Sequence, residues 1–211
     1  MQKDYTDITI LLDRSGSMGR IKNDMVCGIE SFIEEQKKLP GKCTLTLVQF
    51  DSHAYENVFV GKSIKDTPPI NMHPGGSTPL LDSVARCIKE AGERLKAMDV
   101  TERPEFVIMM IVTDGEENAS REFTREAIKK LVTHQTDIYK WHFTYLGADQ
   151  DAFSEASMLG IPQSAALNYK ANPIGTRSMF DSANLAMSSL RTRQSDIMAY
   201  QQSDIDKQNK A

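Results

Sequence analysis

The sequence lacks several features that mark specialised classes of protein. Only three of its 211 residues are cysteines, and none of them has Cys-x-x-Cys spacing. Cys27, Cys43 and Cys87 lie in segments with an apolar pattern, which predicts small buried thiols and no disulfide framework. Residues 1–7 contain no apolar stretch of a secretion signal, and no run approaches the ~18 apolar residues of a membrane span. We therefore expect a cytoplasmic protein that has no membrane partner.

The sequence also lacks an excess of basic charge. It has 25 Lys and Arg against 29 Asp and Glu, so the formal net charge is −4 and the isoelectric point is about 5.6. Proteins that bind nucleic acid mainly through phosphate usually carry dense basic patches, and no Lys/Arg run of that density occurs here. Nucleic acid is therefore not an expected partner.

The chain is long enough for one good hydrophobic core but short for two. We expect one domain over residues 1–191, followed by a polar tail or helix extension over residues 192–211. Ile197, Tyr200 and Ile205 give the tail a weak helical rhythm. Two interpretations stay open: a solvated extension or frayed end, and a helix that binds a partner or a second copy.

Six segments have the composition of β-strands, and helical patterns fall between most of them. The predicted strands are 5–12, 43–50, 55–60, 106–112, 141–146 and 166–169. The predicted helices cover the apolar stripes 21–33, 81–95, 127–132, 152–159 and 176–190. The sequence suggests N-cap residues for two of these helices. Thr78, followed by a first-turn proline, would cap the helix over 81–95, and Thr124 would cap the helix over 127–132.

This order predicts an α/β fold of the doubly wound, Rossmann-like type. Strands separated by helices pair in parallel, and helices then cover both faces of the sheet. Residues 106–112 are apolar at every position, as expected of a central strand that is buried on both sides. Only four residues separate the second and third strands, so the third is predicted to be an antiparallel edge strand.

Polar residues follow the predicted strands at their carboxyl ends, which is where such sheets bind ligands. Asp13 ends the first strand and is followed by Ser15 and Ser17, while Asp114 follows the fourth strand. Thr78 follows a Gly-Gly-Ser turn at the start of a helix. We expect these five side chains to converge. They offer only oxygen ligands, which suits Mg²⁺, with Mn²⁺ or Ca²⁺ as alternatives.

Other interpretations of these and neighbouring residues stay open. The aspartates and serines could each cap a helix separately. Asp51 and Asp149 fit turns or caps better than extra ligands, and Glu116 and Glu117 fit either solvated surface or a charge preference for a partner. The four histidines are scattered without metal-ligand spacing, and His73 is the one that lies near the Gly-Gly turn.

The three pieces Asp13-Arg14-Ser15-Gly16-Ser17, Gly75-Gly76-Ser77-Thr78 and Thr113-Asp114-Gly115 together resemble a known metal site. This is the metal-ion-dependent adhesion site (MIDAS) of von Willebrand factor A (VWA) domains, which integrin I domains share. The resemblance implies the sheet order 3-2-1-4-5-6, with the first and fourth strands side by side. It also implies that Ser15 and Ser17 bind metal directly, Thr78 directly or through water, and Asp13 and Asp114 largely through water.

The resemblance implies a non-enzymatic module whose Mg²⁺ coordinates an Asp or Glu of a partner protein. We expect residues 61–77 and the segment after Asp114 to shape its specificity. Small stand-alone intracellular members occur in bacteria and phages as adaptors, sometimes with ATPase partners. One alternative is a structural or assembly protein whose metal staples loops. Another is a Mg²⁺-dependent phosphatase of the haloacid-dehalogenase type, which is disfavoured because Ser15 stands where that chemistry needs a second aspartate.

Overall fold

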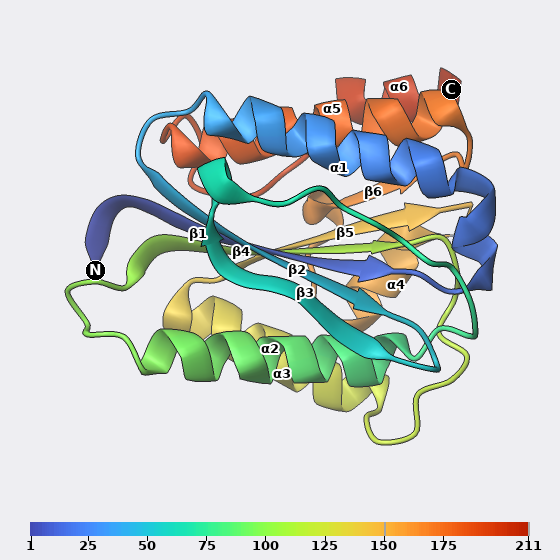
Figure 1. The fold of residues 1–211 in the computed structure, drawn as a ribbon, viewed down its shortest axis with the longest axis horizontal. Coiled ribbons are helices and arrows are strands. Elements are labelled where there is room, and N and C mark those ends of the chain that lie inside the picture. The colour runs from blue at the N-terminus through green and yellow to red at the C-terminus, as the bar shows by residue number, and fades with distance from the viewer. Residues whose placement is uncertain (150, 211) are drawn as a thin grey trace.

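The computed structural model describes residues 1–149 and 151–210 and has three layers, with a six-stranded sheet between two layers of helices (Figure 1). Ala211, the last residue of the predicted tail, lies outside the described residues. The sheet order is β3-β2-β1-β4-β5-β6. The strands are β1 (Gln2–Asp13), β2 (Lys42–Phe50), β3 (Tyr55–Ser63), β4 (Pro104–Thr113), β5 (His142–Ala148) and β6 (Ala166–Tyr169).

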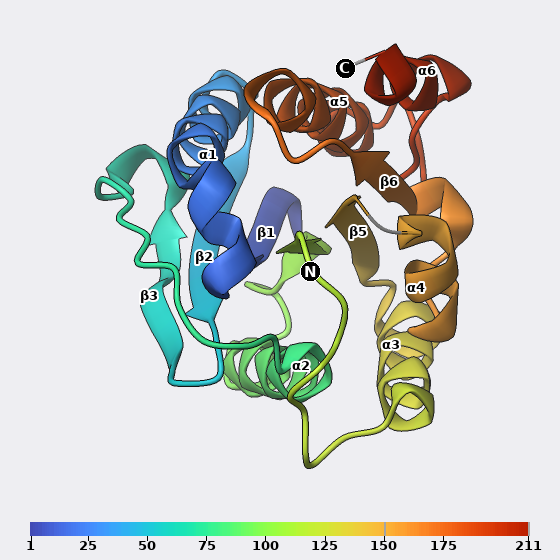
Figure 2. The ribbon, with the colours of Figure 1, turned by 90° about the vertical axis from the view of Figure 1, so that its right-hand side faces the viewer.

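Only the edge strand β3 pairs in antiparallel fashion, with β2; the other four pairings are parallel. The helices are α1 (Lys22–Lys37), α2 (Leu80–Lys96), α3 (Arg125–Tyr139), α4 (Ala152–Met158), α5 (Pro173–Arg191) and α6 (Gln202–Lys210). α1 and α5 cover one face of the sheet, and α2, α3 and α4 cover the other (Figure 2). The predicted fold class, sheet order and edge strand are confirmed. Within the described residues, no helix is both long and apolar enough to cross a bilayer.

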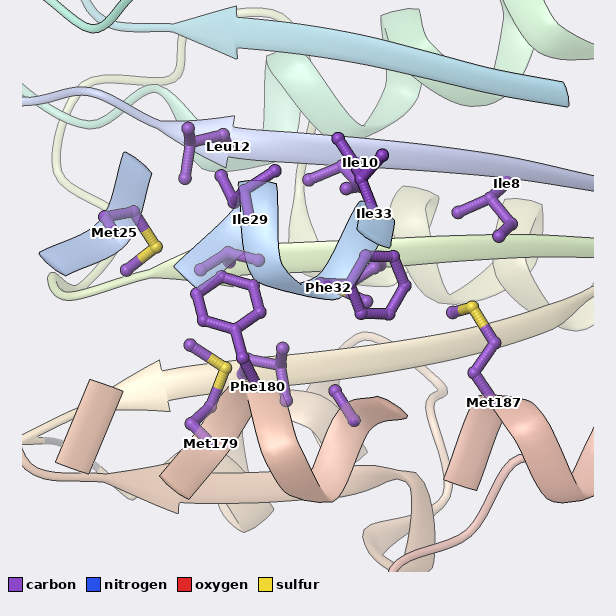
Figure 3. Close-up of a cluster of buried hydrophobic side chains, with 14 of the residues drawn as sticks. Ile8, Ile10, Leu12, Met25, Ile29, Phe32, Ile33, Met179, Phe180 and Met187 are labelled. Carbon is purple, nitrogen blue, oxygen red and sulfur yellow. The ribbon is translucent and has the colours of Figure 1, made fainter. Parts of the chain in front are cut away.

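The central strands are buried on both sides because each face of the sheet packs against its own helical layer. Ile8, Ile10 and Leu12 of β1 point toward α1 and α5 (Figure 3). In β4, Ile108 faces the same cluster, while Met109 faces the cluster under α2 and α3. This two-sided burial explains why residues 106–112 are apolar throughout.

Helices α1 and α5 approach closely because Gly28 provides space for an aromatic ring. A Cβ atom built at Gly28 would lie 2.2 Å from Cδ2 of Phe180 on α5. Phe180 also contacts Phe32 of α1, with ring centroids 6.4 Å apart. The ring therefore occupies the position that a larger residue at 28 would need.

Several residues after α5 pack against the rest of the fold. Met198 and Tyr200 join the core and are 4% and 7% exposed. The hydroxyl groups of Tyr200 and Thr144 lie 2.7 Å apart. In α6, Asp204 accepts a hydrogen bond of 3.0 Å from the Ser182 hydroxyl on α5. Of the apolar rhythm in the tail, Tyr200 thus serves intramolecular packing, whereas Ile197 is exposed.

The cysteine prediction is correct for two of the three residues. Cys43 and Cys87 are buried, whereas Cys27 is exposed, and all three thiols are free. Cys27 lies on the outer side of α1, because the buried positions on its turn of the helix are 25, 28 and 29. An apolar neighbourhood in the sequence did not distinguish the two faces of this helix.

Candidate metal centre

The candidate site lies where the neighbouring strands β1 and β4 end. These strands are parallel and in register up to the pair Leu12 and Val112, so Asp13 lies level with Thr113. The arrowheads of both strands point to the same end of the sheet (Figure 1). The topology therefore places the residues that follow β1 beside those that follow β4, as the sequence predicts.

Asp13 is completely buried and accepts two short hydrogen bonds. Its Oδ1 accepts from the backbone N–H of Ser15 at 2.7 Å, and its Oδ2 accepts from the hydroxyl of Thr113 at 2.6 Å. Burial raises the pKa of Asp13 from 3.8 to about 6; hydrogen bonds from Thr113 and Ser15 oppose this rise, and the charge of Asp114 adds to it. Asp13 thus fixes the turn that carries the two serines.

Ser15 and Ser17 lie at the start of a 3-10 helix, Gly16–Ile21. Ser15 occupies the N-cap position, but its side chain makes no capping hydrogen bond, so the helix-cap alternative does not hold for this residue. The two Oγ atoms are 3.2 Å apart, and Ser17 donates to Oδ1 of Asp114 at 2.6 Å. Both hydroxyl groups therefore face the end of β4.

Thr78 does not cap α2, which corrects the expectation for this helix start. Helix α2 begins at Leu80, with Pro79 in the N-cap position. Thr78 is 2% exposed, and its backbone N–H donates to Oδ1 of Asn118 at 2.9 Å. A Cβ built at Gly115 would lie 3.6 Å from Oγ1 of Thr78 and 3.7 Å from Oγ of Ser17. The two hydroxyl groups thus border one space beside a residue that has no side chain.

Hydrogen bonds connect the loops that carry these residues. Gly16 N–H donates to the carbonyl of Gly76 at 3.0 Å, and Gly75 N–H donates to the carbonyl of Arg14 at 2.9 Å. Ser77 N–H donates to the Ser52 hydroxyl at 2.9 Å. The loops after β1 and before α2 therefore hold each other in place.

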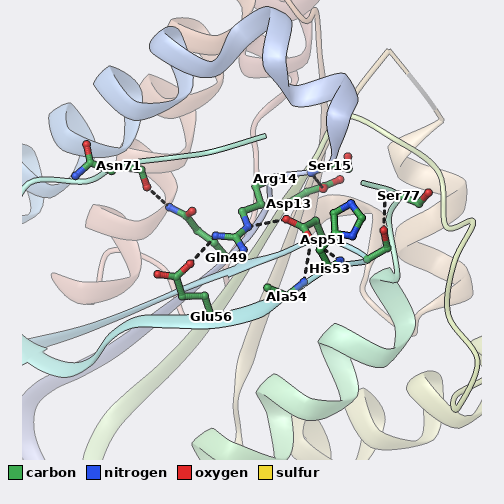
Figure 4. Close-up of polar contacts among 11 residues, drawn as sticks. Asp13, Arg14, Ser15, Gln49, Asp51, His53, Ala54, Glu56, Asn71 and Ser77 are labelled. Atoms are coloured by element: carbon green, nitrogen blue, oxygen red, sulfur yellow. Dashed lines mark hydrogen bonds and ion pairs between the residues drawn. The ribbon is translucent and has the colours of Figure 1, made fainter. Parts of the chain in front are cut away.

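Arg14, between the metal-motif residues, binds the β2–β3 hairpin (Figure 4). Its Nε donates to Oδ2 of Asp51 at 2.8 Å, and its Nη1 donates to Oε2 of Glu56 at 2.5 Å. Oδ1 of Asp51 accepts from the backbone N–H groups of His53 and Ala54 at 2.6 and 2.9 Å. Asp51 is thus the turn residue that the sequence favours, and it also anchors Arg14.

Glu117 has a structural role that the sequence analysis missed. Its carboxylate accepts from the backbone N–H groups of Leu81 at the start of α2 and of Ala119 and Ser120 in its own loop, at 2.9, 2.8 and 2.6 Å. It therefore caps α2 in place of Thr78, which leaves the Thr78 hydroxyl for the site. Glu116 is exposed, as expected of solvated surface.

Asp114 is 6% exposed and only one of its oxygens is hydrogen-bonded within the described part of the chain. Its Oδ2 lies 3.6 Å from Nη2 of Arg20, which lies 3.1 Å from Oδ2 of Asp149. Burial raises the pKa of Asp114, while the Ser17 hydrogen bond and the Arg20 charge oppose the rise. Asp149 also accepts from the Ala171 N–H at 3.3 Å, as a turn residue does.

The donor set has two carboxylates and three hydroxyl groups. Among residues 1–149 and 151–210, no three His, Cys, Asp or Glu side chains converge in a group able to hold a metal ion. A cation here therefore depends on hydroxyl ligands as well as carboxylates. Such all-oxygen sets suit hard divalent cations. Oδ2 of Asp114, buried without a hydrogen bond, is the free acceptor that a cation would use.

The sequence matches no family model and no curated protein. The structure, however, is similar to solved VWA domains. Proximal thread matrix protein 1 from the mussel byssus, with a zinc-occupied MIDAS motif, superposes with a TM-score of 0.60 at 17% identity over 84% of this chain. The match covers 46% of the mussel chain, so this protein spans about half the length of that structure.

Two isolated domains match over almost their whole length. The vWF domain of the type V pili tip protein Mfa5 from Porphyromonas gingivalis gives a TM-score of 0.58 at 11% identity, over 86% of this chain and 94% of that domain. The SpRpn10 VWA domain gives a TM-score of 0.54 at 9% identity, over 82% and 93%. The chain thus has the VWA fold.

Proposed function

We propose that this protein is a non-enzymatic, metal-dependent protein-binding module. Asp13, Ser15, Ser17, Thr78 and Asp114 would hold a divalent cation, Mg²⁺ first, and a partner protein would contribute an Asp or Glu. The observation that carries the proposal is the convergence of Ser17, Thr78 and Asp114 beside Gly115, with Asp13 holding the Ser15 turn.

The charges of the site explain why it would bind an acidic partner. Asp13 and Asp114 together only offset the two charges of a divalent cation, and the hydroxyl groups add none. When bound, the cation supplies an electrophilic centre for an external carboxylate, and Mg²⁺ typically keeps exchangeable waters for such a ligand. Ser17, which is exposed, marks the side of the site from which a partner would approach.

The structural neighbours support a binding role. Mfa5 is a pili tip protein, and the mussel protein holds zinc in its MIDAS motif. The expectation of an ATPase partner, and that of a cytoplasmic location, stay predictions.

The alternative in which a metal only staples loops has less support. Backbone hydrogen bonds from Gly16 to Gly76 and from Gly75 to Arg14 already join the loops. A phosphatase is also disfavoured, because Ser15 replaces the second aspartate and its Oγ lies against another hydroxyl, that of Ser17.

Calorimetric titration with Mg²⁺ and Mn²⁺ tests the site. We expect Thr78→Val and Asp114→Asn to weaken metal binding at least about tenfold, because the first removes a hydroxyl oxygen and the second replaces a carboxylate with a neutral amide. Asp137→Asn, on the exposed side of α3, is the matched control and should bind like wild type. Arg20→Gln should bind somewhat more tightly, because a positive charge 3.6 Å from Asp114 is removed.

Two results would count against the proposal. One is equal metal affinity in wild type, Thr78→Val and Asp114→Asn. The other is a partner, captured by the wild-type protein from its native cells, that binds Asp114→Asn equally well or stays bound in EDTA.

A further inference from the structure

A cavity that is lined in part by basic side chains lies at the opposite end of the sheet from the candidate metal centre. It has a volume of about 290 Å³, and its lining includes Gln36, Lys37, Lys42, Cys43, Lys65 and Arg191. Lys42 pairs with Tyr5, eight residues before Asp13 on β1, which places the cavity roughly 26 Å from the metal centre at ~3.3 Å per residue. The two sites therefore do not share residues.

Arg191, at the end of α5, is a buried cation without a carboxylate partner among the described residues. It is 9% exposed, and Nη1 donates to the backbone carbonyl and to Oε1 of Gln36 at 2.9 and 2.8 Å. Its Nε is buried and makes no hydrogen bond within the described part of the chain. A buried charge is costly unless it is paired, and Arg191 lines the cavity, so an anion bound there would compensate the charge of this guanidinium.

Gln36 holds the guanidinium in a fixed orientation. This glutamine is fully buried, and its Nε2 donates to Oδ1 of Asn184 on α5 at 3.0 Å. The amide is therefore oriented with its oxygen toward Arg191. The position of the cation is set by the packing of α1 against α5, before any ligand binds.

The other charged lining residues are also basic. Lys65 is exposed at the cavity and forms no ion pair with a described carboxylate, whereas Lys37 pairs with Glu34 on its own helix. Lys42 is already engaged, because its ammonium group lies 4.1 Å from the centre of the Tyr5 ring and 3.5 Å from Oε1 of Gln2. Among the described residues, no acidic side chain lines the cavity. Lys65 and Arg191 thus line it without an acidic partner in the described part of the chain.

We propose that this cavity binds a small ligand through a phosphate group. Arg191 would provide the buried donor, and Lys65 would bind an outward oxygen. Two cations match the two negative charges of a phosphate ester better than the single charge of a carboxylate, and guanidinium groups bind phosphate by charge-assisted hydrogen bonds. The volume of about 290 Å³ suits a small metabolite, since pockets for drug-sized ligands range upward from ~300 Å³.

A simpler explanation accounts for only part of the arrangement. Arg191 donates to a carbonyl in the last turn of α1, where helix carbonyls carry partial negative charge. This contact with the end of the helix accounts for the hydrogen bond that Nη1 donates to the carbonyl. It does not explain the unbonded Nε, or why Lys65, which has no carboxylate partner among the described residues, lines the same cavity.

Calorimetric titration of the full chain in EDTA tests the proposal, with inorganic phosphate, glycerol 3-phosphate and acetate as probes at constant ionic strength. We expect both phosphates to bind more tightly than acetate, and glycerol 3-phosphate to be preferred if the ligand is an ester. The variant Lys65→Gln should bind both phosphates at least about threefold more weakly. Lys129→Gln, with the same net charge and an exposed position elsewhere, should bind like wild type.

The Nε–H signal of Arg191 in an NMR spectrum gives a second readout that does not depend on stability. Phosphate should shift this signal in wild type and in the Lys129→Gln control. The proposal is overturned if phosphate binds no more tightly than acetate, if Lys65→Gln and Lys129→Gln bind equally, or if the Arg191 signal does not move at saturating phosphate.

Discussion

At the scale of single residues, Asp13 combines complete burial with a negative charge. Its two hydrogen bonds come from Ser15 and Thr113, and its pKa is nevertheless raised to about 6, mainly by burial. A raised pKa means that the folded protein binds this proton more tightly than the unfolded chain does. Without a cation, the stability associated with Asp13 is therefore lost as pH rises from about 4 to about 6.

We expect Asp13→Asn to be more stable than wild type at pH 7 in EDTA, by at most roughly 3 kcal/mol. The amide carries no charge, and the Thr113 hydroxyl can accept from it while donating to the Gly115 carbonyl at 3.0 Å. At pH 4 the two proteins should differ little, since Asp13 is then largely protonated when folded. Urea unfolding at both pH values measures this.

Magnesium should reverse the order of stability. A cation binds the ionised carboxylate, so it should stabilise wild type at pH 7 and protect the variant less. If Asp13→Asn were equally destabilised at pH 4 and pH 7 in EDTA, the buried charge would not be what limits stability.

The sequence predicted the five candidate ligands because each belongs to a short motif at the end of a strand. It did not predict the contacts that neighbouring residues make around these ligands. Glu117 caps α2 across the site, and Arg20 reaches Asp114 from another element. Such contacts depend on the packing of segments remote in sequence, so no local pattern identifies them.

At the scale of elements, the packing of α1 on α5 depends on the missing side chain of Gly28. We expect Gly28→Ala to lower the free energy of unfolding by about 1–3 kcal/mol, because the new methyl group would overlap the Phe180 ring. Chemical denaturation measures this change.

Gly92→Ala is the matched control in α2, since a Cβ there meets nothing within 4 Å. It should stabilise the protein by roughly 0.5–1 kcal/mol, the ordinary gain of alanine over glycine in a helix. Equal effects of the two substitutions would show that α1 and α5 can move apart at no cost.

Apolar periodicity predicted every strand and the first five helices. It worked because alternation and helical spacing report directly on which face is buried. It failed for the start of α2, where Pro79 and not Thr78 is the N-cap residue, and for the outward Cys27. Both failures concern the direction in which one side chain points, which neighbours across the fold decide.

At the scale of the whole molecule, residues 198–210 extend the core beyond α5. Their polar composition hides this role, because only a few apolar side chains carry it. We expect Met198→Ala to lower the free energy of unfolding by about 2–4 kcal/mol, since this side chain is 4% exposed.

The neighbouring Ile197→Ala is the control, since Ile197 is 59% exposed, and it should change stability by less than about 0.5 kcal/mol. Thermal or urea unfolding separates the two cases. Similar small effects of both variants would mean that the segment is not part of the cooperative unit.

The two edges of the sheet differ in a way that limits how copies of the chain can associate. β6 has four residues and contacts both α4 and α6, whereas β3 has nine residues and pairs only with β2 among the described strands. β3 therefore offers the longer run of backbone groups to another chain, and Glu56 and Lys62 add exposed charge there. Charged side chains on an edge strand oppose its pairing with a second sheet, so they protect the longer of the two edges against aggregation.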